Sequence, residues 1–470
     1  MAKKSPMNAL ERRSVLALSA LYCFRMLGLF MVLPLLTLYG GELEGSTPFL
    51  LGLAIGIYGL TQSFLQVPLG MLSDRIGRIP VLVGGLAMFA GGSFLAATAT
   101  TIEGVIFGRL LQGAGAISST IMALVADLTR DQQRTKAMAI VGISIGVSFA
   151  IAILLGPLLA SAGGLALVFN MTGAMAVIGI LVVIFAIPRV ERVGTHGEVG
   201  TVPGLLWRTL TDFSLFRLNA GVFTLHFILM AAFVALPLVL EQELGVAREA
   251  HWKIYLPVVV LSVIGMIPLI ILGDRSGKLR LALGLGVSGL AISQLLASGA
   301  LGFAVFCLGL WLYFTTFNYL ESALPSLVSK TVYAGGKGTA LGIYATFQFL
   351  GAFVGGAAGG LAMEIGGVGA VLSTCTAVAL LWLPLALSTQ PPRELANRML
   401  RLPDDPGQAE QLLKRLPGME GVADMLLIPE DATVYLKVDE NRFDASILDL
   451  EPEGGEDPGE GAGVVAGSQV

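Results

Sequence analysis

The chain has 470 residues, of which 55% are hydrophobic and 13% are charged, and its mean hydropathy is +0.80. This composition excludes an ordinary soluble protein and indicates a chain that lies largely in a membrane. The net charge of −4 is uneven, since residues 1–390 carry 22 Lys/Arg against 16 Asp/Glu and residues 391–470 carry 7 against 17. The three cysteines lie in apolar runs, which argues against a disulfide framework and a metal site.

Apolar runs long enough to cross ~30 Å of hydrocarbon recur through the first 390 residues. The first follows a basic segment and is too long for a cleaved signal. Eighteen Lys/Arg lie in segments on the side of the N-terminus and two, Arg248 and Lys253, on the other side. The positive-inside rule therefore places both termini in the cytoplasm. The runs predict twelve spanning helices: 14–38, 48–72, 79–100, 103–127, 136–160, 166–187, 216–240, 252–273, 280–298, 301–327, 338–361 and 368–388.

Internal similarity indicates that the membrane part is duplicated. Pro68-Leu69 and the charged segment 74–78 recur about 200 residues later at 268–269 and 274–278, and the segment 30–35 of the first span resembles 233–238 of the seventh. Six spans per copy make the repeat parallel, with the transport cavity between the copies. We therefore expect two six-helix bundles, 1–190 and 216–390, joined by a cytoplasmic linker at 191–215.

The region after the last span predicts a small cytoplasmic α/β domain over 391–450. Strands are expected at 398–402, 424–429 and 433–438, with helices at 405–416 and 441–450. This βαββα order is that of a ferredoxin-like split βαβ unit. Residues 451–470 are rich in glycine and acid and are expected to be disordered.

Ionisable side chains inside the predicted spans are candidates for function because their insertion into lipid is costly. Arg25 lies near the midplane of the first span and should face water or a partner, with a structural ion pair as the alternative. His226 lies at a similar depth in the seventh span and is either a proton carrier or a neutral core histidine. Arg109 lies near the outer end of the fourth span, where snorkelling to the interface is a competing explanation.

Glu321 is the candidate for protonation in the tenth span. Asn318 lies one turn earlier on the same helix face. Pro325 removes the backbone hydrogen bond to the Glu321 carbonyl and is expected to bend the helix. The alternative is a permanently protonated glutamate that joins two helices.

The segment Gly70-x3-Asp74-Arg75-x-Gly77-Arg78 resembles the loop motif of the major facilitator superfamily. Further stretches resemble its YajR-type transporters, whose C-terminal piece is called the YAM domain: Arg25 to Gly28, Arg109 to Gly113, Gly156-Pro157, Phe317 to Glu321, and 324–327.

The resemblance implies a conformational gate at this loop. Asp74 is expected to lie against the start of span 11 at Gly338, and Arg78 to pair with Asp127 at the end of span 4. A weaker second copy of the loop contains Asp274 and Arg275. The resemblance also assigns Arg109 to proton handling or substrate charge, and Gly156-Pro157 to an antiporter hinge, for which a packing kink is the alternative.

These features predict a proton-coupled secondary transporter of the bacterial inner membrane that exports small molecules by antiport. Uptake by proton symport and a sensor or scaffold acting through the C-terminal domain are the alternatives. We expect the lipid bilayer, a small-molecule substrate and protons as partners, and a cytoplasmic ligand or partner for the C-terminal domain. No nucleophile–base pair, metal-ligand cluster or phosphate-binding loop suggests an enzyme, a cofactor, a metal or a nucleic-acid partner.

Overall fold

The computed structural model describes residues 6–188, 203–275, 277–392, 395–403, 405–428, 433–439 and 442–443. The chain forms two compact units. The first comprises Met1–Val332 and Gly336–Arg393, and the second comprises Tyr333–Gly335 and Glu394–Val470. Each is described by itself.

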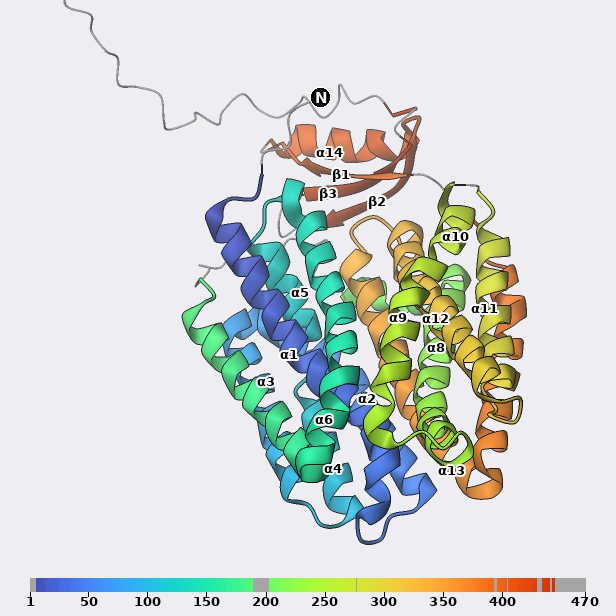
Figure 1. Cartoon of the computed structure of the whole chain (residues 1–470). Helices are drawn as coiled ribbons and strands as arrows, with labels where there is room; N and C mark the ends of the chain where they lie inside the picture. Colours follow the sequence, from blue (N-terminus) through green and yellow to red (C-terminus); the bar gives the residue numbers. More distant parts are fainter. Residues whose placement is uncertain are drawn as a thin grey trace, which may run out of the picture. The chain divides into compact units, whose positions relative to one another are not determined.

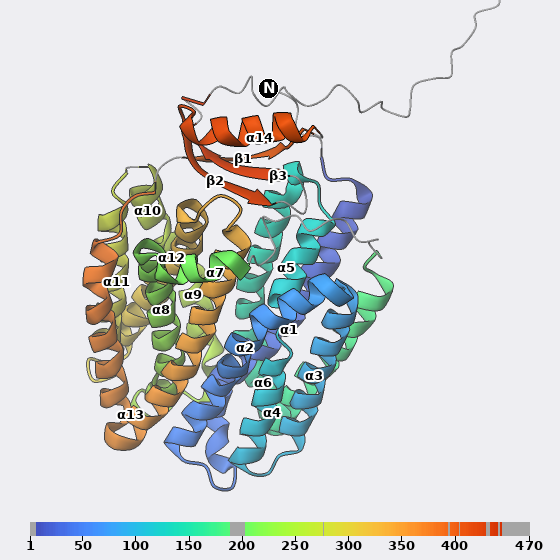
Figure 2. The same cartoon turned by 180° about the vertical axis from the view of Figure 1, so that it is seen from behind.

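The first unit is helical, and the helices of its two sequence halves gather on opposite sides of it (Figures 1 and 2). Short 3-10 turns at Gly40–Glu42 and Arg248–Ala250 and π-helical turns at Val239–Glu243 and Ile271–Arg275 connect or extend the helices. The helices are α1 Ala9–Tyr39, α2 Pro48–Ile76, α3 Arg78–Thr98, α4 Ile102–Ala114, α5 Ser118–Asp127, α6 Asp131–Phe185, α7 Pro203–Thr211, α8 Phe213–Leu238, α9 Trp252–Gly265, α10 Ile267–Ile270, α11 Leu279–Leu296, α12 Phe303–Thr331 and α13 Lys337–Leu387.

Among the described residues, ten helical segments are long and apolar enough to cross a membrane. Two of them, in α6 and α13, have 50 and 51 residues, more than twice the length that ~30 Å of hydrocarbon requires. Both contain a glycine pair with non-helical backbone angles, Gly163–Gly164 and Gly366–Gly367. Each therefore supplies two crossings, and the predicted architecture of an all-α membrane protein with twelve spans is confirmed.

The fourth predicted span is not continuous. The span predicted at 103–127 is present as the apolar segment Ile102–Asp127, but the structure interrupts it at 115–117, between α4 and α5. Gly115 lies so close to the backbone of α3 that an added Cβ would overlap Gly85. The close approach of α3 is accommodated by the non-helical turn Gly115-Ala116-Ile117, which hydropathy does not distinguish from a helix.

The backbone repeats its sharp turns in both halves, which supports the duplication read from the sequence. A positive φ is unfavourable for residues with a Cβ, so these turns require glycine. The corresponding pairs are Gly45 and Gly245 (φ 73° and 66°), Gly77 and Gly277 (101° and 64°), and Gly164 and Gly367 (64° and 65°).

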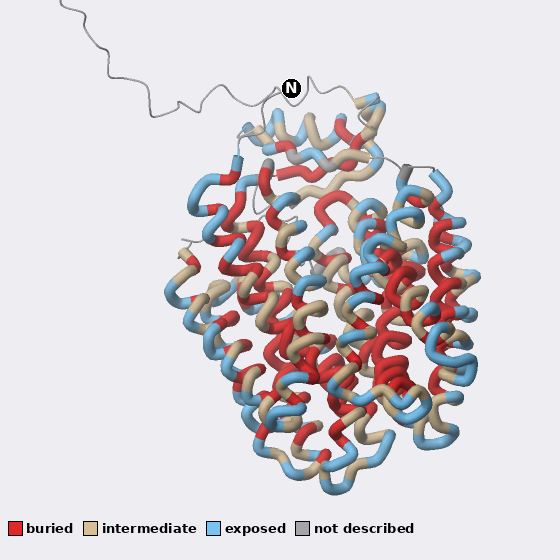
Figure 3. Tube along the Cα trace, viewed as in Figure 1, coloured by how far each residue is buried: buried red, intermediate tan, exposed pale blue. Residues whose placement is uncertain are grey.

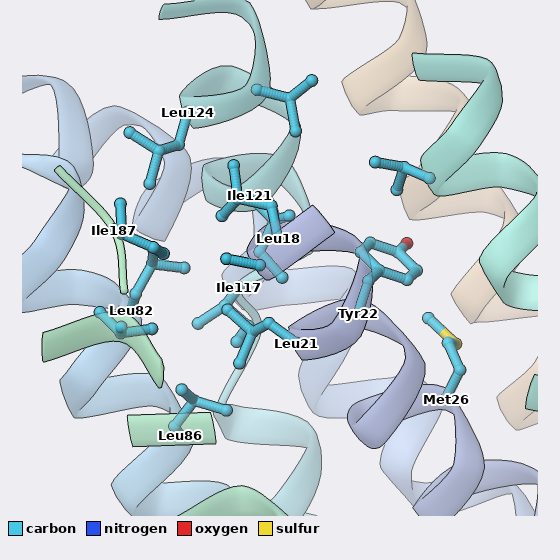
Figure 4. Close-up of a cluster of buried hydrophobic side chains, with 14 of the residues drawn as sticks. Leu18, Leu21, Tyr22, Met26, Leu82, Leu86, Ile117, Ile121, Leu124 and Ile187 are labelled. Atoms are coloured by element: carbon cyan, nitrogen blue, oxygen red, sulfur yellow. The ribbon is translucent and has the colours of Figure 1, made fainter. Parts of the chain in front are cut away.

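Apolar side chains fill the interior of each half, while exposed residues lie on the outside and at the helix ends (Figure 3). In the N-terminal half, α1 contributes Leu18, Leu21 and Tyr22 to a buried cluster that also contains residues of α3 and α5 (Figure 4). Large apolar side chains such as Phe185 and Leu381 remain about three-quarters exposed, at 75% and 76%. On a membrane protein such side chains face lipid, so their exposure carries no cost.

The two halves pack closely near one end of the helices. We call the end that carries the α2–α3 loop (residues 74–78) the basic end, and the end that carries residues 40–47 the opposite end. Near the opposite end, an added Cβ on Gly52 of α2 would lie 2.6 Å from Gly360 Cα, and one on Gly356 would lie 2.8 Å from Gly56 Cα. This glycine seam, Gly52 and Gly56 against Gly356 and Gly360, lets α2 and α13 meet backbone to backbone.

Polar contacts close the same end. Thr37 Oγ1 donates to the Phe233 carbonyl at 3.1 Å, and the Phe49 amide donates to Glu364 Oε2 at 3.1 Å. Arg248 Nη1 donates to the Leu38 carbonyl at 3.3 Å. Each bond joins the N-terminal half to the C-terminal half, so the structure represents a state closed at the opposite end.

The second unit is a three-stranded sheet with a helix. It contains β1 Ala396–Arg401, α14 Pro406–Arg415, β2 Val422–Ile428 and β3 Thr433–Val438. The strand order is β1-β3-β2, and β3 is antiparallel to both neighbours. Val438 of β3 lies opposite Ala396 of β1 and opposite Val422 of β2. β1 and β2 are therefore parallel with β3 between them, which confirms a small α/β domain with split βαβ topology.

Local signals in the sequence explain the helix of this unit. Asp405 caps α14 by accepting from the Gly407 amide at 3.2 Å, and Pro406 occupies the first turn. Its Leu412 and Leu413 pack against the sheet core around Leu436. The helix predicted at 441–450 falls almost wholly outside the described residues.

We expect Gly356→Val to force α2 and α13 apart, because overpacking of a close backbone contact costs roughly 1–3 kcal/mol or more. Spin labels on Thr47 and Ile365, in a background without the three native cysteines, should report a longer or broader distance distribution. Gly142→Val is the matched control, since an added Cβ on Gly142 has nothing within 4 Å. An unchanged distribution in Gly356→Val would contradict the proposed role of the seam.

Deletion of residues 393–470 should leave a monodisperse membrane protein, because the strands and helix of the second unit form their own core. Size-exclusion chromatography in detergent and the thermal unfolding temperature test this expectation. Aggregation of the truncated chain would show that the helical unit needs the domain to fold.

Candidate functional site

Gly77 permits the tight loop at the basic end. Its φ of 101° ends α2 and allows α3 to begin at Arg78. The Arg78 guanidinium donates to Asp74 Oδ1, and its Nε lies 3.1 Å from Asp127 Oδ2 at the end of α5. One cation thus links two carboxylates from two helices. An added Cβ on Gly70 would lie 3.1 Å from Ser119 Oγ, so glycine there lets α2 approach α5.

The other gate residues lie apart from this ion pair. Gly338 is the second residue of α13, and within the described part of the chain the side-chain hydrogen bonds of Asp74 go to Arg78 and none goes to Gly338. Arg75 is exposed. In the second copy, Asp274 is exposed in the π-helical turn, and the side chain of Arg275 lies outside the described residues. Their roles in gating stay predictions.

Arg25 lies at the centre of a buried polar cluster in the N-terminal half. Its side chain is 2% exposed. Nη2 donates to Tyr58 Oη and to Gln62 Oε1, both at 2.6 Å, and Nη1 donates to Ser118 Oγ. Gln62 in turn donates to Gln66 Oε1 at 2.8 Å. All of these partners are neutral, so the predicted alternative of a structural ion pair does not describe the contacts of Arg25.

The Arg109 guanidinium is bonded inside the protein and does not reach the membrane–water interface. It is fully buried, and its Nε and Nη2 donate to the carbonyls of Ala54 and Ile55 at 3.2 and 3.3 Å. Nη1 donates to Gln112 Oε1 at 2.9 Å. The snorkelling alternative is therefore wrong. The guanidinium carbon also lies 5.2 Å from the centre of the Tyr58 ring, a cation–π distance.

In the C-terminal half, three helices bring His226, Glu321 and Gln348 together. The Gln348 amide nitrogen lies 2.8 Å from His226 Nε2 and 3.2 Å from Glu321 Oε1. His226 Nδ1 lies 3.2 Å from the Val222 carbonyl, so Nδ1 carries the proton and Nε2 accepts from the amide. Glu321 Oε2 lies 3.8 Å from His226 Nε2 and has no hydrogen-bond partner among the described residues.

Asn318 and Gly156, two further residues predicted for function, lie outside the contacts of the Arg25 and Glu321 clusters. Asn318 Nδ2 donates to Ser262 Oγ of α9 at 2.9 Å and makes no described bond to Glu321. An added Cβ on Gly156 would lie 3.4 Å from Leu35, so α6 packs closely on α1 there. The backbone around Pro157 remains helical in this state, since the non-helical angles in α6 are at Gly163 and Gly164. A hinge at Gly156-Pro157 stays a prediction.

Several residues of these clusters were not identified from the sequence. Tyr58, Gln62 and Gln66 recur every four residues on one face of α2, a spacing that was available as a signal. Gln348 is a single amide in a long apolar run, and only the packing of α8, α12 and α13 shows its role.

A second ion pair at the basic end, between the buried Glu11 and the exposed Arg130, was also missed. Glu11, 2% exposed, accepts from Arg130 Nε and Nη2 at 2.9 Å and from the Arg130 amide at 3.0 Å. The same carboxylate completes a capping box with Asn8 at the start of α1. The Asn-x-x-Glu pattern could have identified the helix start, although not the partner.

Comparisons with known proteins agree with this architecture. Residues 18–356 match the Major Facilitator Superfamily. The chain is 41% identical to the inner membrane transport protein YajR of Escherichia coli over 438 residues, which cover 92% of this chain and 96% of that protein. It is 26% identical to the multidrug resistance protein MdtH of Aeromonas salmonicida, over 77% of this chain and 89% of that one.

Solved structures show the same fold. The human organic anion transporter MFSD10 aligns with a TM-score of 0.58 and 22% identity, over 81% of this chain and 100% of its own. A bacterial homolog of the human lysosomal transporter Spinster, inward-facing and occupied, aligns with a TM-score of 0.65 and 13% identity, over 82% and 97%. The resemblance predicted from the loop motif is confirmed, and the chain belongs to the major facilitator superfamily of multi-pass membrane transporters.

Proposed function

We propose that this transporter is driven by the proton gradient and exports small molecules by antiport through alternating access. The observation that carries the proposal is the contact between Glu321, His226 and Gln348 inside the helical unit. Two groups that can take up a proton are there joined by one amide, on three helices of the same half. Intramembrane ionisable residues in contact with each other are typical of proton relays.

The hydrogen-bond directions define how a proton would change this cluster. With His226 neutral, Nε2 accepts from the Gln348 amide, which also donates to Glu321. A proton arriving at Nε2 turns that nitrogen into a donor, so the amide nitrogen can no longer bond to it. The imidazolium then has Glu321 Oε2, at 3.8 Å, as the nearby acceptor for the proton. A proton on His226 or on Glu321 would therefore change the hydrogen bonds that join α8, α12 and α13.

The proposed cycle alternates between closure at the two ends. The glycine seam and the bond from Phe49 to Glu364 hold the opposite end closed in the described state. At the basic end, we propose that Asp74 reaches the first amides of α13 at Gly338 in the alternative state and that Arg78 and Asp127 orient it. The basic residues of the loops support a cytoplasmic location of this end and of both termini, in a bacterial inner membrane.

The alternatives differ in what supports them. Proton symport uses the same groups in the other direction, and export is supported by the name of the MdtH relative and by Gly156-Pro157. A sensor or scaffold acting through the C-terminal domain would not require Arg25, Arg109 and Glu321 inside the helical unit, where their insertion is costly. We propose that the C-terminal domain regulates transport by binding a cytoplasmic ligand or partner.

We expect Glu321→Gln to uncouple transport from the proton gradient, because the change keeps the side-chain shape and removes its titration. A compound that collapses the pH gradient in everted vesicles containing the wild type should no longer do so. Exchange of the labelled compound between equal concentrations on the two sides should persist. Glu103→Gln is the matched control and should behave as the wild type, because Glu103 lies at the start of α4, away from the Glu321 cluster. Gradient-driven transport by Glu321→Gln at the wild-type rate would refute the coupling role.

Asp74→Asn should favour the state open at the basic end. Asn caps a helix start as well as Asp does, so the variant loses only the interaction of the negative charge with the helix dipole. That interaction contributes roughly 0.3–1 kcal/mol, which changes a two-state equilibrium about two- to fivefold. Spin labels on Ile76 and Lys337 should then report a larger population of long distances, with slower turnover and unchanged yield of folded protein. Asp74→Glu, which keeps the charge, should restore most of the wild-type distribution. Identical distributions in Asp74→Asn and the wild type would reduce the loop to a turn without a gating role.

A further inference from the structure

We propose that the Arg25 cluster binds the carboxylate of an organic anion, which makes small organic anions the substrate class of this transporter. The site consists of Arg25 on α1, Tyr58 on α2 and Ser118 on α5. The inference rests on the proposed transport function for its biological meaning. The binding itself is independent of the direction of transport and of proton coupling.

The first argument is the charge of the cluster. Arg25 lies halfway along α1 and is 2% exposed, and its described partners are a phenol, an amide and a hydroxyl. Among the described residues, no carboxylate lies within ion-pair distance of it. A buried guanidinium normally has a counter-ion, because burial of an unpaired charge is strongly unfavourable. A negative charge is the component that this cluster lacks.

The second argument is the surplus of hydrogen-bond donors. Arg25 Nε is buried and has no partner in the described part of the chain. Tyr58 Oη and Ser118 Oγ both accept from Arg25, and neither hydroxyl donates to a described acceptor. Three N–H or O–H groups around one cation are thus available without acceptors. An ionised carboxylate accepts through two oxygens and donates nothing, so it matches this arrangement.

Arg109 provides an internal comparison. It is as deeply buried in the same half, yet each of its nitrogens donates to a carbonyl or to the Gln112 side chain. Deep burial alone therefore does not leave a guanidinium nitrogen without a partner in this half, since Arg109 is buried as deeply as Arg25 and all three of its nitrogens are bonded. Arg109 joins α4 to the α2 backbone, whereas Arg25 retains binding capacity.

The position of the cluster fits a substrate site. The Tyr58 ring lies 6.5 Å from the ring of Phe349 on α13, so the cluster borders the C-terminal half, where transporters with parallel repeats bind their substrates. Ser118 is also the first residue of α5, and no side chain caps that helix start. The interruption of the fourth span thus places a helix N-terminus, with its partial positive charge, beside Arg25.

The test is ligand-induced stabilisation of the full-length protein in detergent. The probes are acetate, benzoate and 2-naphthoate, each compared with its primary amide at equal concentration and ionic strength. A ligand that binds the folded state raises the unfolding temperature in a saturable manner. We expect at least one carboxylate to raise it and the matching amide to have no effect. Equal shifts for each acid and its amide, or no shift by any carboxylate, would overturn the proposal.

Substitutions in the Arg25 cluster test whether the carboxylate-induced stabilisation arises there. Arg25→Met should abolish the carboxylate shift, and Arg25→Lys should retain part of it because it keeps the charge. If Arg25→Met does not fold, Tyr58→Phe and Ser118→Ala remain as tests. Each removes a donor to a charged acceptor and should raise the carboxylate concentration at half of the maximal shift roughly tenfold. Tyr255→Phe, which removes a buried unpartnered hydroxyl in the other half, is the matched control. Wild-type carboxylate binding by Tyr58→Phe and Ser118→Ala would contradict the assignment.

Glu321→Gln separates this inference from the proposed function. If proton coupling is wrong but anion binding is right, this variant and the wild type transport alike and both show the carboxylate shift. If coupling is right and the anion site is wrong, Glu321→Gln loses gradient-driven transport and no protein shows a shift that depends on Arg25.

Discussion

A charged side chain inside a membrane must find partners within the protein, and this constraint organises both halves of the molecule. In the N-terminal half, Arg109 is satisfied by backbone carbonyls of α2, which fixes α4 against α2. Arg25 is satisfied only in part, by neutral side chains of α2 and α5. In the C-terminal half, Glu321 and His226 share the amide of Gln348. The cations and the carboxylate are thus separated between the halves, and each group makes its described contacts within its own half.

The separation explains how a rigid scaffold can carry groups that respond to ligands. The ion pairs at the basic end, Arg78 with Asp74 and Asp127 and Arg130 with Glu11, all lie within the N-terminal half and connect the starts and ends of its helices. Near the opposite end, the halves meet through backbone packing, single hydrogen bonds and an ion pair of 3.6 Å between Arg248 and the exposed Glu42. The buried polar clusters thus lie within the halves, whereas the polar contacts that join the halves lie at one end, as alternating access requires.

Hydropathy and glycine patterns predicted most of the fold because spanning length and positive backbone angles are properties of local sequence. The twelve spans, the duplicated loop and the topology of the C-terminal strands follow from such patterns. The interruption of span 4 did not, because it depends on the approach of Gly85 on another helix. The candidate site was predictable only as single residues: Arg25 and Glu321 stood out by charge, whereas Gln348 acquires its role from three helices that meet in space.

The glycine seam between α2 and α13 also has a kinetic consequence. Glycine has no side-chain rotamers, so the two surfaces lose no rotamer freedom when they meet and need no repacking when they part. A seam of interlocking leucines would bury more apolar area, but its side chains would have to disengage one by one. Contact through bare backbone allows α2 and α13 to separate as rigid bodies, which favours rapid opening and closing over tight closure.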